Sequence, residues 1–430
     1  MIGDRIDVNI AGGLDIPLPN MVPVAVSFEA PTLESIDRTV SEQFKNPAVR
    51  EKIKPDQIIA IGCGSRGIAR INEVAKAVVI EIKALGGKPF IFPAMASHGA
   101  ATAEGQIQVL EGYGITEEYV GCPLRATMDV IKVDELDDGT PIYMDRYASE
   151  ADGVVLINRV KPHTNFRAPI ESGIVKMMTI GMGKISGATE LHFHGFEAFG
   201  ELLPKAARII MAKRNFLFGV GIVENAHEDI AIIEAMPAET LFDRETALTV
   251  RSRELMSKLL FDGIDVLVID EIGKDISGSG LDPNITGRNN RFIPWSGPPE
   301  VQKIVLLDLT EKTHGNACGL GVADVITMNL YKKMDIGATY ANLITATYLD
   351  GGFIPMIMNT EEEAIRLAVK TLRRVKPMDA RIVRIQNTLE LTDIWVSEPM
   401  LPDVEAHRQM KAKGTPGPFG FSPEGNLRSR

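Results

Sequence analysis

The sequence lacks the features that define several classes of protein. Only three of its 430 residues are cysteines, Cys63, Cys122 and Cys318, and none stands in a Cys-x-x-Cys spacing. We therefore expect neither a disulfide framework nor a thiolate zinc site. The N-terminus has no basic start followed by an apolar run, and no apolar segment approaches the roughly 20 residues that a membrane-spanning helix needs. These absences predict a cytoplasmic protein with no membrane partner.

Positive charge is also scarce. Lys and Arg number 46 against 57 Asp and Glu, which gives a net charge of −11, and the basic residues form no cluster. Because phosphate backbones are bound by clustered Lys and Arg, we expect no nucleic-acid partner. The apolar content of 45% is typical of a globular protein, and the length suffices for about two or three domains.

Short runs rich in Ile and Val alternate with longer amphipathic segments, the pattern of parallel strands joined by crossover helices, so the predicted class is α/β with largely parallel sheets. We expect two α/β domains, residues 1–262 and 263–399, with a cleft for cofactor and substrate between them. Residues 400–430 are rich in Pro and Gly and are expected to form an irregular tail that packs on the N-terminal domain. The expected strands are Gln57–Ile61, Pro89–Phe92, Gly153–Ile157, Leu217–Val223, Val266–Ile269, Ile304–Leu307, Phe353–Met358 and Ile382–Ile385, and the clearest helices are Ile71–Leu85, Glu245–Leu260 and Glu361–Val375.

Polar residues follow three of these strands. Arg66 comes after IIAI, His98 after PFIF and His163 after VVLI. In open α/β sheets, ligands bind at the carboxyl ends of the strands, so these side chains converge if the three strands are neighbours. The first loop also matches Gly-x-Gly-x-x-Gly at Gly62, Gly64 and Gly67, but the next strand carries no acid for a ribose. The loop can therefore cradle a phosphate with Arg66, form a dinucleotide site, or be a tight turn.

The segment from Arg159 to Gly195 is the richest in chemistry. It holds three of the seven histidines and three lysines with little hydrophobic periodicity, a pattern more typical of a site than of a core. Lys176 lies inside an apolar run, where a charged ammonium is costly. His192 and His194 are two residues apart, so we expect at most one of them to be a ligand.

In their order, these residues resemble the nickel-dependent lactate racemases and their nickel-pincer-nucleotide relatives. The resemblance covers about Ile58 to Gly195: an arginine after the first strand, His98 in SHG, His163 in KPH, Lys176 in VKMM and a histidine at 192. Two departures stand out. Cys63 occupies the position where the family has an aspartate, and FRAPIES lengthens the segment between His163 and Lys176.

The resemblance implies a racemase or epimerase that inverts C2 of a 2-hydroxy acid. It makes His98 and His163 alternate acid and base on the two faces of the substrate. The implied cofactor is nickel in a pyridinium-dithio mononucleotide, supplied by cofactor-synthesis enzymes. The implied nickel ligand is His192, with His194 as the alternative, and the implied contacts of the nucleotide are Lys176, tethered or not, with Gly64, Ser65, Arg66 and Lys184.

This chemistry needs a hydride acceptor because C2–H is too weakly acidic for an imidazole of pKa about 6.5. The second domain departs from the family in the loop Glu271–Arg288, which predicts a different substrate, such as a larger or more polar hydroxy acid or a sugar acid. The residues expected to contact it are Lys274, Ser277, Ser279, Asn284 and Arg288. Two other functions remain open: an NAD-dependent oxidoreductase that uses the glycine loop, and a non-catalytic protein that binds a nucleotide or a metal.

Overall fold

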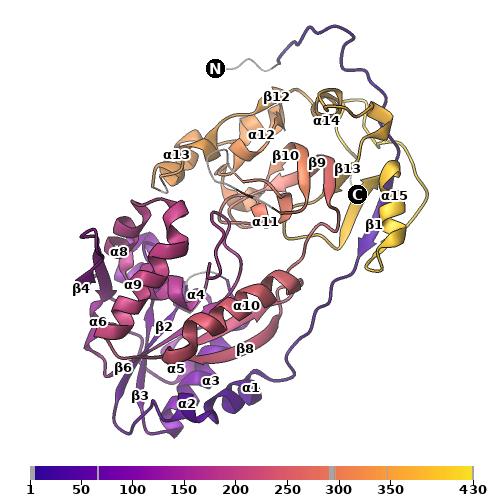
Figure 1. Cartoon of the computed structure of the whole chain (residues 1–430). Helices are drawn as coiled ribbons and strands as arrows, with labels where there is room; N and C mark the ends of the chain where they lie inside the picture. The colour runs from indigo at the N-terminus through magenta and orange to yellow at the C-terminus, as the bar shows by residue number, and fades with distance from the viewer. Residues whose placement is uncertain (1–4, 65–66, 290–294, 296, 346, 429–430) are drawn as a thin grey trace. The chain divides into compact units, whose positions relative to one another are not determined.

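The structure is a computed structural model that describes residues 5–64, 67–289, 295, 297–345 and 347–428 (Figure 1). The chain forms two compact units. One comprises Glu29–Met256 and is called the central unit here; the other combines Met1–Phe28 with Ser257–Arg430 and is called the terminal unit. Each unit is built around its own sheet.

The sheet of the central unit has the strand order β3-β2-β6-β7-β8. The first four strands run parallel, and β8 pairs antiparallel with β7. The strands are β2 (Ile58–Cys63), β3 (Lys88–Pro93), β6 (Gly153–Arg159), β7 (Phe216–Glu224) and β8 (Ile230–Pro237). A separate hairpin is formed by β4 (Val130–Glu135) and β5 (Pro141–Asp145).

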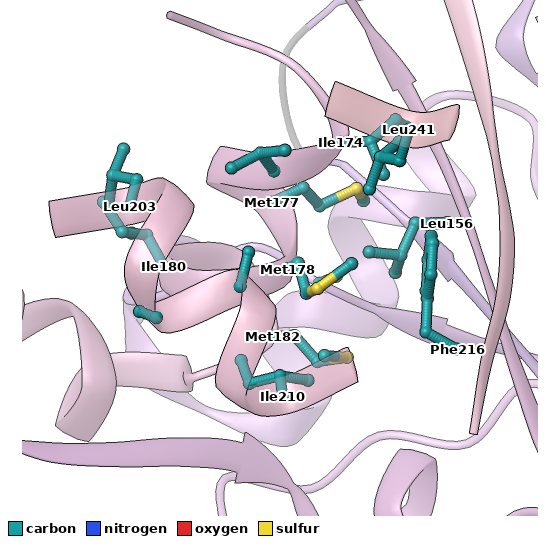
Figure 2. Close-up of a cluster of buried hydrophobic side chains, with 14 of the residues drawn as sticks. Leu156, Ile174, Met177, Met178, Ile180, Met182, Leu203, Ile210, Phe216 and Leu241 are labelled. Atoms are coloured by element: carbon teal, nitrogen blue, oxygen red, sulfur yellow. The ribbon is translucent and has the colours of Figure 1, made fainter. Parts of the chain in front are cut away.

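Both faces of this sheet are buried, which explains why its strands read as continuous apolar runs. Along β6, Leu156 belongs to one hydrophobic cluster, whereas its neighbours Val155 and Ile157 belong to the other. This is the alternation that a strand imposes on successive side chains. Figure 2 shows the first cluster, where Met177, Met178 and Met182 lie near Leu156 and Phe216.

The helices of the central unit vary in length from single turns to four turns. They are α1 (Ile36–Phe44), α2 (Pro47–Arg50), α3 (Ile71–Ala84), α4 (Ala103–Gly112), α5 (Glu117–Val120), α6 (Arg146–Glu150), α7 (Ile174–Lys176), α8 (Lys184–His192), α9 (Phe199–Lys213) and α10 (Leu241–Leu255). Between α7 and α8 the segment η2 (Met177–Gly181) winds as a π-helical turn.

The sheet of the terminal unit has the order β12-β11-β10-β9-β13-β14-β1-β15. Its first five strands are parallel, whereas β14, β1 and β15 pair antiparallel. The strands are β1 (Met21–Val26), β9 (Gly263–Ile272), β10 (Glu300–Leu309), β11 (Val325–Thr327), β12 (Met356–Met358), β13 (Ile382–Ile385), β14 (Asp393–Ser397) and β15 (Met410–Ala412). The helices are α11 (Pro283–Thr286), α12 (Met328–Lys333), α13 (Ile336–Thr345), α14 (Glu361–Lys370) and α15 (Leu401–Ala406).

The predicted α/β class with largely parallel sheets is confirmed, and all eight expected strands overlap strands of the structure. The division into units differs from the prediction at both ends of the chain. The first residues join the terminal unit because β1 pairs with β14 and β15, and the second boundary falls at Met256 rather than at Asp262. The tail also packs on the terminal unit, where Phe419 and Phe421 lie against its hydrophobic cluster.

Among the described residues, no helix has both the length and the apolar character that crossing a membrane requires.

Candidate active site

The strand order brings three of the predicted loops to one edge of the central sheet. β2 lies between β3 and β6, and Cys63 is in register with Pro93 and with Ile157. The loops that begin at Gly64, after Pro93 and after Arg159 therefore leave the sheet side by side. The predicted convergence of their side chains depends on this arrangement. Ser65 and Arg66 lie outside the described residues.

Gly64 lies against the segment that carries Lys176. A Cβ atom added to Gly64 would stand 2.8 Å from Oδ1 of Asn158 and 3.7 Å from Cε of Met177. Asn158 also donates to the carbonyl of Gly173 at 3.0 Å, just before α7. A side chain at position 64 would therefore displace the side chain of Asn158, and Gly64 lies at van der Waals distance from the lysine segment.

His163 is half-buried and held from its backbone. Its N–H donates to Oε2 of Glu171 at 2.6 Å, and the other oxygen of Glu171 accepts from Ala168 at 3.0 Å and pairs with Arg253 of α10. Glu171 is fully buried. A buried carboxylate with charge and hydrogen-bond partners is a rigid anchor, so it fixes the main chain from which the imidazole projects.

Both ring nitrogens of His163 have partners. Nδ1 accepts from the backbone N–H of Asn165 at 3.0 Å, and Nε2 lies 2.8 Å from Nζ of Lys176. Because Nδ1 is an acceptor, the neutral imidazole carries its hydrogen on Nε2. Nε2 thus faces the amine of Lys176, a group that is a nucleophile when it is uncharged.

The segment of Lys176 is anchored at its start by Glu245 of α10. This buried carboxyl accepts from the backbone N–H of Val175 at 3.1 Å. Burial raises the pKa of Glu245 to about 8, against the lowering effect of the N–H groups of Val175 and Ile174. The π-helical turn η2 follows directly, a local geometry that is frequent at functional sites.

An aromatic cluster joins His163 to His192. The ring centroids of His163 and His192 lie 5.8 Å and 5.7 Å from that of Phe196. Phe166 and Phe199 complete the cluster at 4.6 Å from His163 and 5.1 Å from His192, respectively. The two histidines, separated by 29 positions in the sequence, therefore face one group of rings.

His192 is oriented like a metal-binding histidine. Its Nδ1 lies 2.6 Å from the carbonyl oxygen of Ala188, so Nδ1 donates and Nε2 keeps a lone pair. Burial lowers the pKa of His192, the bond to Ala188 raises it, and positive charge on Lys176 lowers it further. The neutral form, which metal ions require, is thus favoured.

His194 has a different environment. Its Nε2 lies 2.8 Å from Oγ1 of Thr140 and 3.9 Å from Asp138, in the turn of the β4–β5 hairpin. His192 is the last residue of helix α8, whereas His194 lies beyond the end of the helix, so the two histidines have different backbone settings.

The loop of His98 packs against the turn after Lys176. The N–H of Ala96 donates to the carbonyl of Gly181 at 3.0 Å, and His98 itself is exposed. Ala96, Ala100 and Ala101 have φ values of 50°, 55° and 55°. Left-handed backbone at alanine is strained, and such strain gathers at functional sites.

Lys184 is placed differently from the prediction. Its side chain is 0% exposed, and its ammonium lies 3.0 Å from Asp145 and donates to Gln106 at 2.9 Å and to the carbonyl of Pro93 at 2.5 Å. Burial lowers the pKa of Lys184 and raises that of Asp145, and each partner's charge opposes the shift of the other. The ammonium is therefore directed at internal acceptors and not at a cofactor.

The predicted substrate residues lie in the terminal unit and make contacts within it. Arg288 pairs with Asp324 at 2.6 Å and donates to the carbonyls of Val322, Val301 and Gln302. Ser277 and Ser279 are buried and bonded to each other. Asn284 donates to Asp282, and Lys274 donates to the carbonyl of Gly278.

A metal at His192 would find no full set of ligands among the described side chains. Among the residues that the structure describes, no group of three or more His, Cys, Asp or Glu side chains is arranged to hold an ion. One imidazole with a free Nε2 lone pair fits a metal whose other ligands come with a bound group. The amine of Lys176, 2.8 Å from Nε2 of His163, fits the same group as an attachment point.

Sequence reasoning missed the residues that position this site. Glu171, Glu245 and Arg253 are ordinary charged residues in the sequence. The burial of Glu171 and Glu245, and the pairing of Arg253 with Glu171, follow only from the packing of α10. Phe166, Phe196 and Phe199 carried a visible signal, because three aromatic residues flank the histidines in a chain with only 6% aromatic content.

The fold and the site define a two-unit α/β protein with a histidine and lysine site at the carboxyl edge of a parallel sheet. Residues 15–198 match the family model of the lactate racemase N-terminal domain, and this range contains every candidate residue of the central unit. This part of the chain is therefore similar to the N-terminal domain of the lactate racemases, as its motifs predicted.

Among solved structures, the lactate racemase apoprotein from Thermoanaerobacterium thermosaccharolyticum is similar over 85% of this chain and 94% of that chain, with a TM-score of 0.53 and 11% identity. At this identity the likeness concerns the fold. A protein from Thermotoga maritima is similar over 65% of this chain and 72% of that chain, with a TM-score of 0.46 and 14% identity. No curated protein matches the chain.

Proposed function

We propose that this protein is a racemase or epimerase that inverts C2 of a 2-hydroxy acid with a nickel-pincer nucleotide. The observation that carries the proposal is the convergence of His163, Lys176 and His192. Nζ of Lys176 lies 2.8 Å from Nε2 of His163, and both histidines contact the ring of Phe196. A proton carrier, a nucleophilic amine and a metal-binding nitrogen thus meet in a domain that is similar to the N-terminal domain of the lactate racemases.

Three sets of residues would hold the cofactor. Lys176 would attach or contact its ring, His192 would bind nickel through Nε2, and the loop of Gly64, Ser65 and Arg66 would receive its phosphate. Sulfur and imidazole are reasonable ligands for Ni(II). Lys184 is left out of this set because its ammonium is buried among internal acceptors.

When bound, the nickel-pincer nucleotide supplies the hydride acceptor that C2 of a hydroxy acid requires. The protein supplies proton transfer at the hydroxyl group, with His163 serving one face and His98 the other. The bond of its backbone N–H to the buried Glu171 would orient His163 for this role.

The glycine loop argues against an NAD-dependent oxidoreductase. Gly62 lies inside β2, and a Cβ atom there would stand 2.5 Å from Leu156 and 2.9 Å from Phe92, so packing of the sheet already requires this glycine. β3 ends in buried apolar residues and offers no acid for a ribose.

The proposal is tested with protein produced together with the cofactor-synthesis enzymes. A panel of single-enantiomer hydroxy acids is incubated with it, and the products are separated by chiral chromatography. We expect one or more acids to be converted to a mixture of configurations, with nickel bound to the protein. Nickel-loaded protein that inverts no member of a broad panel, sugar acids included, would leave only the carrier function.

A further inference from the structure

Three polar side chains are buried together beneath the loop of His98. Asp145 ends β5, Lys184 begins α8 and Gln106 lies in α4, and each is 0% exposed. They come from separate elements, so their meeting depends on the folded central unit.

The ammonium of Lys184 organises this group. It is bound by the carboxylate of Asp145 at 3.0 Å, by Oε1 of Gln106 at 2.9 Å and by the carbonyl of Pro93 at 2.5 Å. An ammonium donates and never accepts, so Gln106 must turn its oxygen toward Lys184. The amide nitrogen of Gln106 is thereby directed to the opposite side.

On that side lies the loop of His98. Nε2 of Gln106 donates to the carbonyl of Ala96 at 2.9 Å and to that of His98 at 3.3 Å. The amide nitrogen has two hydrogens, and each has an acceptor on the loop. Gln106 therefore connects a buried charge to the backbone of the exposed histidine.

The loop of His98 needs such a restraint because its backbone is strained. Ala96, Ala100 and Ala101 have positive φ values, as does Gly99 at 63°. Gly99 and Gly105 also approach each other closely, because a Cβ atom at Gly99 would lie 2.5 Å from the carbonyl carbon of Gly105. A strained loop persists only where its surroundings stabilise it.

We propose that Gln106, oriented by Lys184 and Asp145, is a positioning residue that fixes the loop of His98 for proton transfer. This inference rests on the proposed function for the role of His98. The restraint of the loop by Gln106 is a property of the protein itself and can be measured without cofactor or substrate.

The test uses Gln106→Glu, which keeps the side-chain length and the acceptor for Lys184 but removes both donors to the loop. Gln108→Glu is the matched control, because Gln108 is an exposed residue of the same helix. Gln106→Met removes the same donors without adding charge and replaces Gln106→Glu if that variant does not fold.

The first readout is hydrogen exchange by mass spectrometry on the cofactor-free full chain. We expect exchange of the amides of residues 96–102 to accelerate about tenfold in Gln106→Glu, the effect of losing a hydrogen bond. Gln108→Glu should match the wild type. Equal exchange in the loops of all three proteins would overturn the inference.

The second readout uses the loaded enzyme. We expect kcat of Gln106→Glu to fall about 10- to 100-fold, because small displacements of a catalytic group are costly, with KM and nickel content unchanged. If Gln106 acts through His98, Gln106→Glu adds no further loss in a His98→Ala background. Multiplicative losses in the double variant would contradict the positioning role. Absence of turnover in the wild type would refute the proposed function and leave the exchange result standing.

Discussion

In both units, polar residues lie on a loop that follows a parallel strand, but the partners of their side chains differ. In the central unit, the loop after β6 directs His163 at Lys176 and at the aromatic ring that also contacts His192. In the terminal unit, the loop after β9 turns Arg288 onto Asp324 and three backbone carbonyls. Polar residues at a strand end therefore indicate a site only where their partners are other reactive side chains.

The largest expected effect comes from His163. His163→Ala removes the proton carrier beside Lys176, so we expect kcat for inversion to fall about 1,000-fold, a typical contribution of general acid–base catalysis. Nickel content, measured by mass spectrometry of the metal, should stay at the wild-type level because His192 is intact. Inversion at the wild-type rate by this variant would exclude His163 from proton transfer.

The next effect concerns the metal. His192→Ala removes Nε2, the nitrogen whose lone pair is available because Nδ1 donates to the carbonyl of Ala188. We therefore expect the affinity of the protein for nickel to fall at least about 100-fold. His194→Ala is the matched control and should retain nickel, because His194 bonds to Thr140. The reverse pattern in a nickel-retention assay would assign the metal to His194.

In the terminal unit we expect a loss of stability. Arg288→Ala leaves Asp324 without its closest cation and removes one donor to each of three carbonyls, which should lower the free energy of unfolding by about 2–3 kcal/mol. Denaturant unfolding measures this, with Arg373→Ala, an exposed arginine of the same unit, as control. A large rise in KM with unchanged stability would instead support the predicted contact with substrate.

A smaller effect tests the anchor of the lysine segment. Between about pH 4.5 and pH 8, Glu245 keeps its proton in the folded protein and releases it in the unfolded chain, so rising pH favours unfolding across this window. Glu245→Gln stays neutral at every pH. We expect its unfolding free energy to be close to the wild type near pH 5 and to exceed it by at least about 2 kcal/mol at pH 8. Parallel curves for the two proteins would show that Glu245 ionises normally.

The strands of the sheets, and the loops after them that carry the candidate site residues, could be predicted because both depend on local sequence. Uninterrupted runs such as IIAIGC mark a parallel strand buried on both faces, and the residue after each strand lies at the binding edge. Because β3, β2 and β6 are neighbours, the loops that carry Gly64, His98 and His163 leave the same edge of the sheet, and the convergence of their side chains stays a prediction.

The supports of the site could not be predicted because they depend on distant partners. Lys184 meets Gln106 across 78 positions of the sequence, and Arg253 meets Glu171 across 82. No local pattern distinguishes such a lysine from an exposed one, so its burial was missed and a cofactor contact was predicted. The pairing of β1 with β14 is a contact of the same long-range kind and moved the first residues into the terminal unit.

The central claim is that His163, Lys176 and His192 surround one nickel-bearing group. A crystal structure of the loaded protein, with anomalous diffraction recorded at the nickel absorption edge, tests it most directly. We predict one nickel peak at bonding distance from Nε2 of His192, beside Lys176. A catalytically active crystal whose nickel lies away from His192, or that contains none, would contradict the account.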